Sequence, residues 1–501
     1  MKKEISAKRF RISKPLLAGV IAAITLIVVL TAVLLSVCRK DDLPSATDTT
    51  PIYEMTLSYE GGRTLSLRQD VLYFNTTGET LSEIKFHLYP NAFSESAENK
   101  PYLPEEKETF FYNGESFGRI NVLSAKTDRS TAEFSVYGDG GQILEVPCKL
   151  NDGDSVTVSL ECEIVLPECR ARFGIAPDSV NLTGFYPALC IYENGAWRED
   201  VYCAVGDPFY SEIASFYVTL NKPTSMKVAA SGTVTATSDA SVEIVAENVR
   251  DFGMCLSDKY SLLSADFLLN GKTVKVNYFS LSDQNAQETL ALAVRAVETF
   301  SSAFGDYPYP AFTVAQAEMC AGGMEYGSFV TVNPVTSSRA AYEQTVVHET
   351  AHQWWFGAVG SDQINSPWLD EGLTEFSTAL FYLLNGDEKT YDEIVSSSAE
   401  YYRRYQSLPA AIGFDPSMNR PLYGYVAAGE YVAVTYMKGL LLFDTLMTLA
   451  GKDRFLSCMQ AYYSANRFGI ATQENLEAVF STGNLNLGGI IRGYTNGTAV
   501  I

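Results

Sequence analysis

Residues 346–355 read VVHETAHQWW, and their apolar residues follow a helical pattern that ends at Gly357. Side chains four positions apart lie on the same face of a helix, so His348 and His352 can both reach one metal ion, with Glu349 beside it. This H-E-x-x-H spacing is typical of zinc hydrolases, in which the glutamate is the general base. The stretch therefore predicts a helix that carries two metal ligands and a catalytic base, Glu349.

A third ligand is expected downstream, because a catalytic zinc ion has three protein ligands and keeps one position open for water. Ser366 and Pro367 predict the N-cap and first position of the next helix, which places Glu371 in its first turns. Eighteen residues separate Glu371 from His352, enough for a helix end, a loop and a return pass. We expect Glu375, one turn later, to accept the second N–H of a ligand histidine.

The alternative for any two histidines at this spacing is an incidental pair on a surface helix. The chain has only three histidines, so their falling into this motif by chance is improbable. The third, His87, lies in a strand-like stretch over residues 85–89 and is expected to be structural.

Composition excludes some partners and indicates more than one domain. A chain of 501 residues exceeds what one hydrophobic core normally serves, so two or three domains are expected. The formal net charge of −22 argues against nucleic acid as a partner, since a phosphate backbone is bound by clustered Lys and Arg.

An uncharged apolar run over residues 16–37 is long enough to cross a bilayer as a helix. Basic residues dominate before it, so the positive-inside rule predicts a cytoplasmic segment over residues 1–14, a transmembrane anchor over 15–38 and an extracytoplasmic remainder. A polar, Pro-bounded linker follows over 39–51. A cleaved signal peptide and a lipoprotein-like attachment at Cys38 are the alternatives.

The remaining chain is expected to hold a β-rich domain over residues 52–268, as a sandwich or saddle, and an α+β domain over residues 269–501. Short alternating stretches separated by Gly, Asn, Asp and Pro indicate the first. Helical periodicity over residues 288–304, strand-like stretches at 312–316 and 329–333, and helices from 340 onward indicate the second.

Eight cysteines follow the apolar run, and five of them lie between residues 148 and 203. One or two disulfides in this stretch are expected if the compartment is oxidising, and buried free thiols are the alternative.

The metal pattern is similar to that of the M1 family of zinc aminopeptidases, within the gluzincin group. The likeness rests on His348, Glu349 and His352, the eighteen-residue gap and Glu371. It spans nearly all of the chain after the apolar run and implies a thermolysin-like α+β catalytic domain with one Zn²⁺ per chain.

The family also carries a Gly-x-Met-Glu-Asn segment on an edge strand before the zinc helix. Gly322-Gly323-Met324-Glu325-Tyr326 stands in that place here. The resemblance implies that this segment binds substrate and that Glu325 pairs with the free α-amine of a peptide.

A Tyr-x-Lys-Gly element follows the third ligand in the family, and Tyr436-Met437-Lys438-Gly439 corresponds to it. The resemblance implies that Tyr436 stabilises the oxyanion. Tyr431 is a weaker candidate for that role, and the alternative is a core or surface aromatic.

Three features depart from the family pattern. Tyr326 replaces asparagine, and Asp370 stands before Glu371 where asparagine is common. A second acidic anchor for the amine is not placed, and the large C-terminal helical domain of many members is expected to be absent, which would open the site.

We therefore expect a membrane-anchored, extracytoplasmic zinc aminopeptidase that acts on peptides with a free N-terminus. The alternatives are a cell-surface endopeptidase of the same fold and a catalytically silent binding or sensory module.

Overall fold

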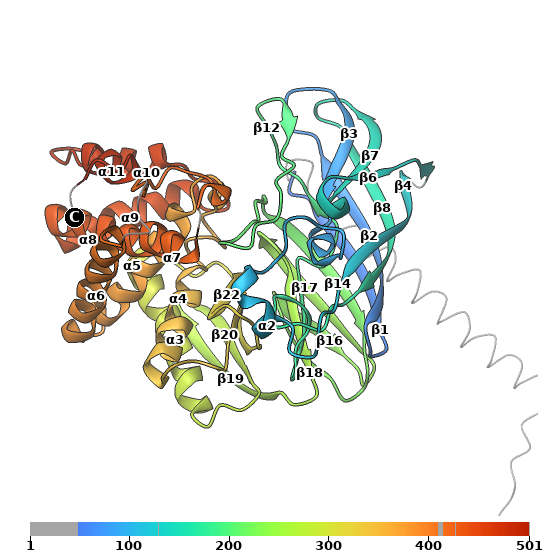
Figure 1. The fold of residues 1–501 in the computed structure, drawn as a ribbon, viewed down its shortest axis with the longest axis horizontal. Helices are drawn as coiled ribbons and strands as arrows, with labels where there is room; N and C mark the ends of the chain where they lie inside the picture. Colours follow the sequence, from blue (N-terminus) through green and yellow to red (C-terminus); the bar gives the residue numbers. More distant parts are fainter. Residues whose placement is uncertain (1–48, 129, 409–413, 426, 500–501) are drawn as a thin grey trace, which may run out of the picture. The chain divides into compact units, whose positions relative to one another are not determined.

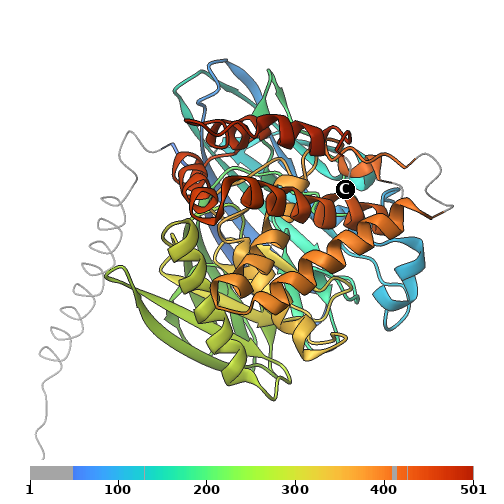
Figure 2. The ribbon, with the colours of Figure 1, turned by 90° about the vertical axis from the view of Figure 1, so that its left-hand side faces the viewer.

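The described part of the chain has a β-rich half followed by a mainly helical half (Figure 1). The computed structural model describes residues 49–499 except 129, 409–413 and 426. Residues from Thr50 onward form one compact unit. Figure 2 views the molecule from the helical side, with the last helices in front.

An eight-stranded sheet is the largest element of the β-rich half. Alternate residues of its strands are buried, as in β1 and β2, because side chains of a strand point to opposite faces in turn. Neighbouring strands are antiparallel except for the parallel pair β1 and β14. In spatial order the strands are β16 (Thr233–Thr237), β17 (Ser241–Val249), β14 (Ala214–Asn221), β1 (Ile52–Tyr59), β2 (Thr64–Phe74), β8 (Ser155–Val165), β4 (Arg119–Thr127) and β5 (Ser130–Ala132).

Two four-stranded sheets and a hairpin complete this half. Strands β10 and β18 are buried on both faces. One sheet has the order β15 (Lys227–Ala230), β18 (Gly253–Ser257), β10 (Val180–Thr183) and β9 (Phe173–Ile175); the other has β11 (Ala188–Leu189), β3 (Leu81–His87), β7 (Ile143–Leu150) and β6 (Ser135–Tyr137); the hairpin is β12 (Tyr192–Glu193) and β13 (Ala196–Trp197). Short helical turns lie between them: η1 (Tyr89–Phe93), η2 (Pro104–Glu106), α2 (Lys107–Phe110) and η3 (Asp139–Gly141).

A five-stranded mixed sheet supports the candidate site. Its order is β19 (Ser261–Leu269), β20 (Lys272–Ser280), β21 (Ala311–Gln316), β23 (Phe329–Val332) and β22 (Gly323–Tyr326), which makes β22 an edge strand. Helix α3 (Ala286–Phe304) packs on β19 and β20, and α4 (Arg339–Ala351) packs on β22 and β23.

The remaining helices follow α4: α6, η6 and α8 pack on α5, α9 and α11 pack on α8, and α10 packs on α9. A Cβ on Gly372 of α5 would lie 2.7 Å from Cα of Gly439, so α5 and α8 touch backbone to backbone at these two glycines. The elements are α5 (Trp368–Leu384), α6 (Glu388–Gln406), η5 (Leu422–Gly424), α7 (Ala428–Tyr431), η6 (Val432–Met437), α8 (Lys438–Ala450), α9 (Lys452–Asn466), α10 (Gln473–Val479) and α11 (Gly488–Thr495).

The structure confirms an α+β fold with a β-rich first half, and the predicted helix and strands near residues 288–333 appear as α3, β21 and β23. Strand β19 already belongs to the five-stranded sheet, and the division at residues 268/269 stays a prediction. The segments predicted at 1–14 and 15–38 lie outside the described residues, as do residues 39–48 of the predicted linker.

Among the described residues, one helical stretch, Ala428–Ala450, is long and apolar enough to cross a membrane. Most of it is buried inside the protein, as in the core helix of a globular domain.

All eight cysteines after residue 42 are free thiols in the structure. The expected disulfides between residues 148 and 203 are therefore not formed, and the alternative of free thiols holds. Three of the five cysteines in that stretch, Cys162, Cys169 and Cys190, are buried as small apolar side chains.

Candidate metal centre and substrate-binding residues

Helix α4 delivers the H-E-x-x-H residues to the site. It begins after Ser338, whose side chain accepts a hydrogen bond from the Ala341 backbone N–H at 3.1 Å, an N-cap of the usual kind. His348 and Glu349 lie in the last turn, and His352 is the C-cap residue. The two imidazoles thus remain one turn apart on one face.

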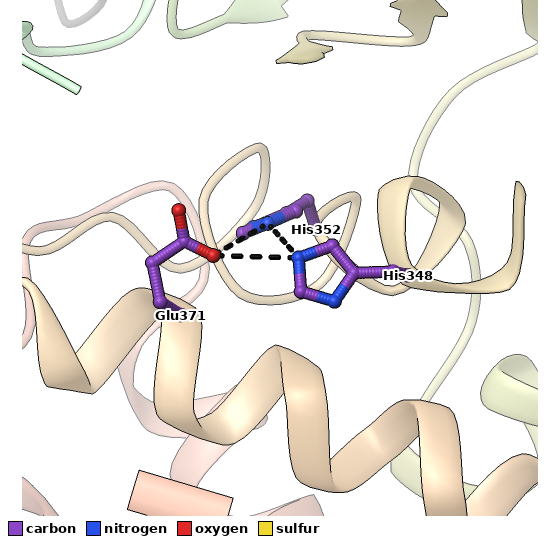
Figure 3. A group of neighbouring side chains, drawn as sticks. All are labelled: His348, His352 and Glu371. Carbon is purple, nitrogen blue, oxygen red and sulfur yellow. Dashed lines mark hydrogen bonds and ion pairs between the residues drawn. The ribbon is translucent and has the colours of Figure 1, made fainter. Parts of the chain in front are cut away.

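Helix α5 brings the third residue, Glu371, against both histidines (Figure 3). Glu371 Oε2 lies 3.3 Å from His348 Nε2 and 3.4 Å from His352 Nε2, and the two nitrogens are 3.2 Å apart. A zinc ion held at about 2.0–2.1 Å by three corners of a tetrahedron keeps those ligand atoms about 3.3–3.4 Å apart. The triangle formed by these three atoms therefore fits zinc.

The electrostatics of the cluster favour a cation at this point. Glu371 Oε2 is buried and makes no hydrogen bond, so it lacks a partner that a metal ion would supply. Burial disfavours charge on Glu371, but the two imidazoles hold its pKa well below the ordinary value. Burial also acts against a charged His348, yet Glu371 and Glu375 raise its pKa to about 10.

Each histidine has a carboxylate on its other ring nitrogen. Glu375 Oε2 lies 3.0 Å from His348 Nδ1, as expected for a partner that fixes the tautomer. Asp370 Oδ1 lies 2.8 Å from His352 Nδ1, a contact that the sequence did not predict. Both contacts leave Nε2 free to bind a metal ion.

Glu349 of α4 lies against β22, the edge strand that precedes this helix in the chain. A Cβ on Gly323 would lie 2.4 Å from Glu349 Oε1, so a larger residue at this position would displace the Glu349 carboxylate. Gly322 has no such restriction, since its nearest contact would be Thr345 at 3.8 Å. Burial raises the pKa of Glu349 to about 7, and its Oε2 makes no hydrogen bond.

Side chains of β22 alternate between the metal cluster and the β-rich half. Glu325 is buried and groups with Glu349 and His352, with ligand atoms within 4.8 Å of one another. Met324 and Tyr326 belong to a separate apolar cluster, and the Tyr326 hydroxyl donates to Thr183 Oγ1 at 2.9 Å. The side chain of Tyr326, which stands in place of the family's asparagine, thus points away from the candidate metal ligands.

Tyr436 lies in η6, a π-helical segment of the kind often found at functional sites. Its ring stacks on that of His348 with centroids 6.0 Å apart. Burial and then Glu371 raise its pKa well above the ordinary value, so the phenol keeps its proton. Tyr431 packs edge-on against Tyr436, at 5.6 Å, and is more deeply buried.

Lys438 and Gly439, which follow Tyr436 at the start of α8, anchor that helix to its neighbours. Lys438 is fully buried and donates to the carbonyl oxygens of Pro416 and of Tyr494, the latter at 2.7 Å. Gly439 allows the contact of α8 with α5 at Gly372, one residue after Glu371. These contacts explain why lysine and glycine follow the tyrosine.

Comparison with known proteins identifies this half of the chain. The Peptidase family M1 domain matches residues 288–494, a range that contains Glu325, Glu349, Tyr436 and the three candidate ligands. The chain therefore carries a peptidase family M1 domain. The resemblance seen in the sequence is confirmed, and zinc is the cofactor that this domain implies.

Similar proteins support the assignment over different lengths. Aminopeptidase 2 of Candida albicans is 26% identical over 197 residues, which cover 36% of this chain and 20% of that protein. Aminopeptidase N of Streptomyces lividans is 26% identical over 183 residues, 33% of this chain and 20% of the relative. The chain thus aligns with about a fifth of the length of these relatives.

A solved structure matches nearly the whole fold. The M1 zinc metallopeptidase from Deinococcus radiodurans superposes with a TM-score of 0.65 and 18% identity, covering 91% of this chain and 98% of the other. The β-rich half and the M1 domain therefore occur together in that fold.

The structure adds Asp207, from the β-rich half, to the M1 site. Asp207 is buried, pairs with Arg172 at 2.8 Å, and has its pKa raised to about 6 by burial despite that pairing. Its charge also acts on Glu325 and Glu371. No periodic pattern in the sequence marks it, because it lies in the loop between β13 and β14, 164 residues before Glu371.

A cleft of about 140 Å³ lies beside β22. Gly323 and Met324 form one wall, and Arg172, Tyr202 and Cys320 contribute to the others. It adjoins the strand at the point where Gly323 contacts Glu349.

His87 lies outside the M1 domain, fully buried at the end of β3 and stacked on Tyr89 with centroids 4.9 Å apart. Burial lowers its pKa to about 4, so it is neutral near pH 7. This setting agrees with the structural role expected from the sequence.

Proposed function

We propose that the chain is a zinc-dependent aminopeptidase that removes residues from peptides with a free N-terminus. The M1 domain places it among zinc metallopeptidases, and the position of Glu325 supports the finer assignment. Glu325 is a buried carboxylate on an edge strand, two residues from the glycine against which Glu349 rests. A peptide whose ammonium group pairs with Glu325 would present its first peptide bond beside Glu349.

We assign His348, His352 and Glu371 as the ligands that hold zinc. When bound there, zinc supplies Lewis-acid polarisation and lowers the pKa of a water molecule toward about 7. Glu375 and Asp370 keep the two imidazoles in the tautomer that offers Nε2.

Glu349 is the general base in this proposal. With a pKa raised to about 7 by burial, it can accept a proton from water as the oxygen attacks the scissile carbonyl carbon. The same carboxyl group then gives that proton to the nitrogen of the leaving peptide, which departs as an amine.

Tyr436 stabilises the oxyanion that develops on the carbonyl oxygen. Its raised pKa keeps the phenolic proton in place, so it can donate a hydrogen bond. Such a donor is worth about 2.7–4 kcal/mol in the transition state.

Glu325 binds the substrate ammonium group. Asp207 is a second carboxyl group, whose negative charge acts on Glu325. Two acids around one ammonium group would fix the N-terminus of the substrate, so that only the first peptide bond reaches the catalytic residues. We assign the backbone of Gly322, Gly323 and Met324 to substrate binding along β22, and Gly323 and Met324 also border the neighbouring cleft.

Membrane anchoring belongs to the same proposal. The apolar run at residues 16–37 and the basic residues before it support a single-pass anchor with a cytoplasmic N-terminus and an extracytoplasmic enzyme. Protease protection of tagged termini in sealed cells would test this; an enzyme that stays in the soluble fraction contradicts it.

The decisive test of function compares free and N-acetylated peptides of one sequence, with a panel of aminoacyl-coumarin substrates. We expect cleavage only with a free amine, loss of activity on chelation and recovery with Zn²⁺. Equal cleavage of the acetylated peptide would indicate an endopeptidase instead, and zinc-independent cleavage would contradict the mechanism.

A further inference from the structure

One side chain, Gln363, contacts both the carboxylate that we assign to the amine and the carboxylate that orients a metal ligand. Its Nε2 donates to Glu325 Oε1 at 3.2 Å and to Asp370 Oδ2. Asp370 in turn holds His352 Nδ1 at 2.8 Å. A continuous chain of contacts therefore runs from Glu325 through Gln363 and Asp370 to His352.

We infer that Gln363 is a positioning residue that couples the amine-binding end of the site to the metal-binding end. The part of this inference that concerns the amine rests on the proposed function, whereas the part that concerns zinc does not.

The chemistry of the amide suits this position. Glu325, Asp370 and Gln363 are all buried, and each residue exposes only 2–3% of its surface. Two buried carboxylates this close disfavour each other's charge, and a neutral group with two N–H donors can serve both without competing with zinc. Lysine would add a cation, and glutamate would add a third negative charge.

The loop that carries Gln363 is held from outside the M1 domain. Asp362 accepts hydrogen bonds from the backbone N–H groups of Ile364 and Asn365, at 3.1 and 3.0 Å. Its other oxygen pairs with Arg198 of the β-rich half at 3.0 Å. The amide is therefore fixed in place before substrate or metal arrives.

The test uses Gln363→Met, which keeps the length of the side chain and removes both donors. Zinc affinity is measured on the full chain without substrate, by competition with a chromophoric chelator. KM and kcat are measured with a leucyl-coumarin substrate.

We expect the zinc Kd to rise about 10-fold, the lower end of what loss of a ligand's outer partner causes. KM should rise several-fold because Glu325 loses the hydrogen-bond donor that holds its carboxyl group in position. Gln316→Met is the matched control: Gln316 is equally buried, makes hydrogen bonds with Leu281, Ser282 and Tyr342, and lies outside the site. It should lower thermal stability and leave both constants unchanged.

Double variants separate positioning from a general loss of packing. In an Asp370→Asn background, Gln363→Met should no longer change the zinc Kd. In a Glu325→Ala background, it should no longer change KM. Fully additive effects in both backgrounds would overturn the inference.

A second variant keeps the test open if Gln363→Met does not fold. Gln363→Glu retains the shape and, when protonated, has one O–H donor, so it can serve one carboxylate but not both. At least one of the two constants should then change, and wild-type values of both would overturn the coupling. If no aminopeptidase activity exists, the zinc measurement still decides the contact through Asp370.

Discussion

The proposed metal-binding end and the proposed amine-binding end of the site are built in different ways. The first is made by two consecutive helices, α4 and α5, whose ligands are spaced by helical periodicity and one loop. The second combines an edge strand, the loop around residue 363 and Asp207 of the β-rich half. Local spacing therefore suffices to define a metal site, whereas recognition of the substrate depends on how distant segments pack.

The largest effect is expected from Glu371→Ala at the metal end. Loss of a ligand should raise the zinc Kd by more than about 100-fold, beyond the effect of losing an outer partner. Activity should fall to background, and metal content can be measured after dialysis. The exposed Glu393 of α6 provides the control, since Glu393→Ala should change neither quantity. Full zinc content in Glu371→Ala would show that this end of the site was wrongly assigned.

Glu349→Gln separates the base from the ligands. Removal of a general base should lower kcat by about 1,000-fold while the zinc content stays at one per chain. The alternative ligand set of Glu325, Glu349 and His352 predicts loss of zinc together with activity. Metal analysis of the purified variant distinguishes the two.

Tyr436→Phe tests the oxyanion donor that η6 brings to the metal end. We expect kcat to fall about 100-fold with little change in KM, because the interaction forms only in the transition state. Tyr431→Phe is the matched comparison from the preceding turn, with a smaller loss expected. A larger loss for Tyr431→Phe would transfer the role to that residue.

Glu325→Ala tests the amine end. A hydrogen bond to a charged group contributes about 1.5–3 kcal/mol, so kcat/KM for free-amine substrates should fall about 10- to 100-fold. Zinc content should remain unchanged, which would show that the two ends are separable in binding their own ligands. An unchanged preference for free amines would remove the aminopeptidase assignment.

The last prediction concerns stability instead of activity, and it involves His87, which lies outside the M1 domain. Burial lowers its pKa from 6.5 to about 4. The unfolded chain therefore binds the proton more readily, so the free energy of unfolding should decrease as pH falls from about 6.5 to 4. This contribution is at most about 3 kcal/mol.

Chemical denaturation of the wild type and of His87→Phe at pH 7 and pH 4.5 checks this expectation. The variant should show the weaker dependence on pH. Identical dependence in both proteins would mean that other groups determine the acid response.

The contrast between the two ends explains which residues could be predicted. His348, His352, Glu371 and Glu375 follow from spacing on helices, because side chains one turn apart must share a face. Asp370 was visible only as a departure from the family, and its contact with His352 depends on how α5 approaches the end of α4.

Other features required the packed structure. The direction of Tyr326 toward Thr183 follows from strand alternation combined with the position of β10, which the sequence does not give. The free cysteines likewise reflect packing, since spacing alone cannot decide between buried thiols and disulfides.

The sequence by itself determined the H-E-x-x-H helix, the helix with the third ligand, the order of β-rich and helical regions and the zinc chemistry, because each depends on local periodicity and side-chain type. Only the tertiary structure decided that Gln363 contacts Glu325 and that the charge of Asp207 acts on both Glu325 and Glu371. Glu325 and Gln363 lie on an edge strand and a loop of the M1 domain, 38 residues apart, and Asp207 comes from a loop of the β-rich half, so only tertiary packing brings them near one another.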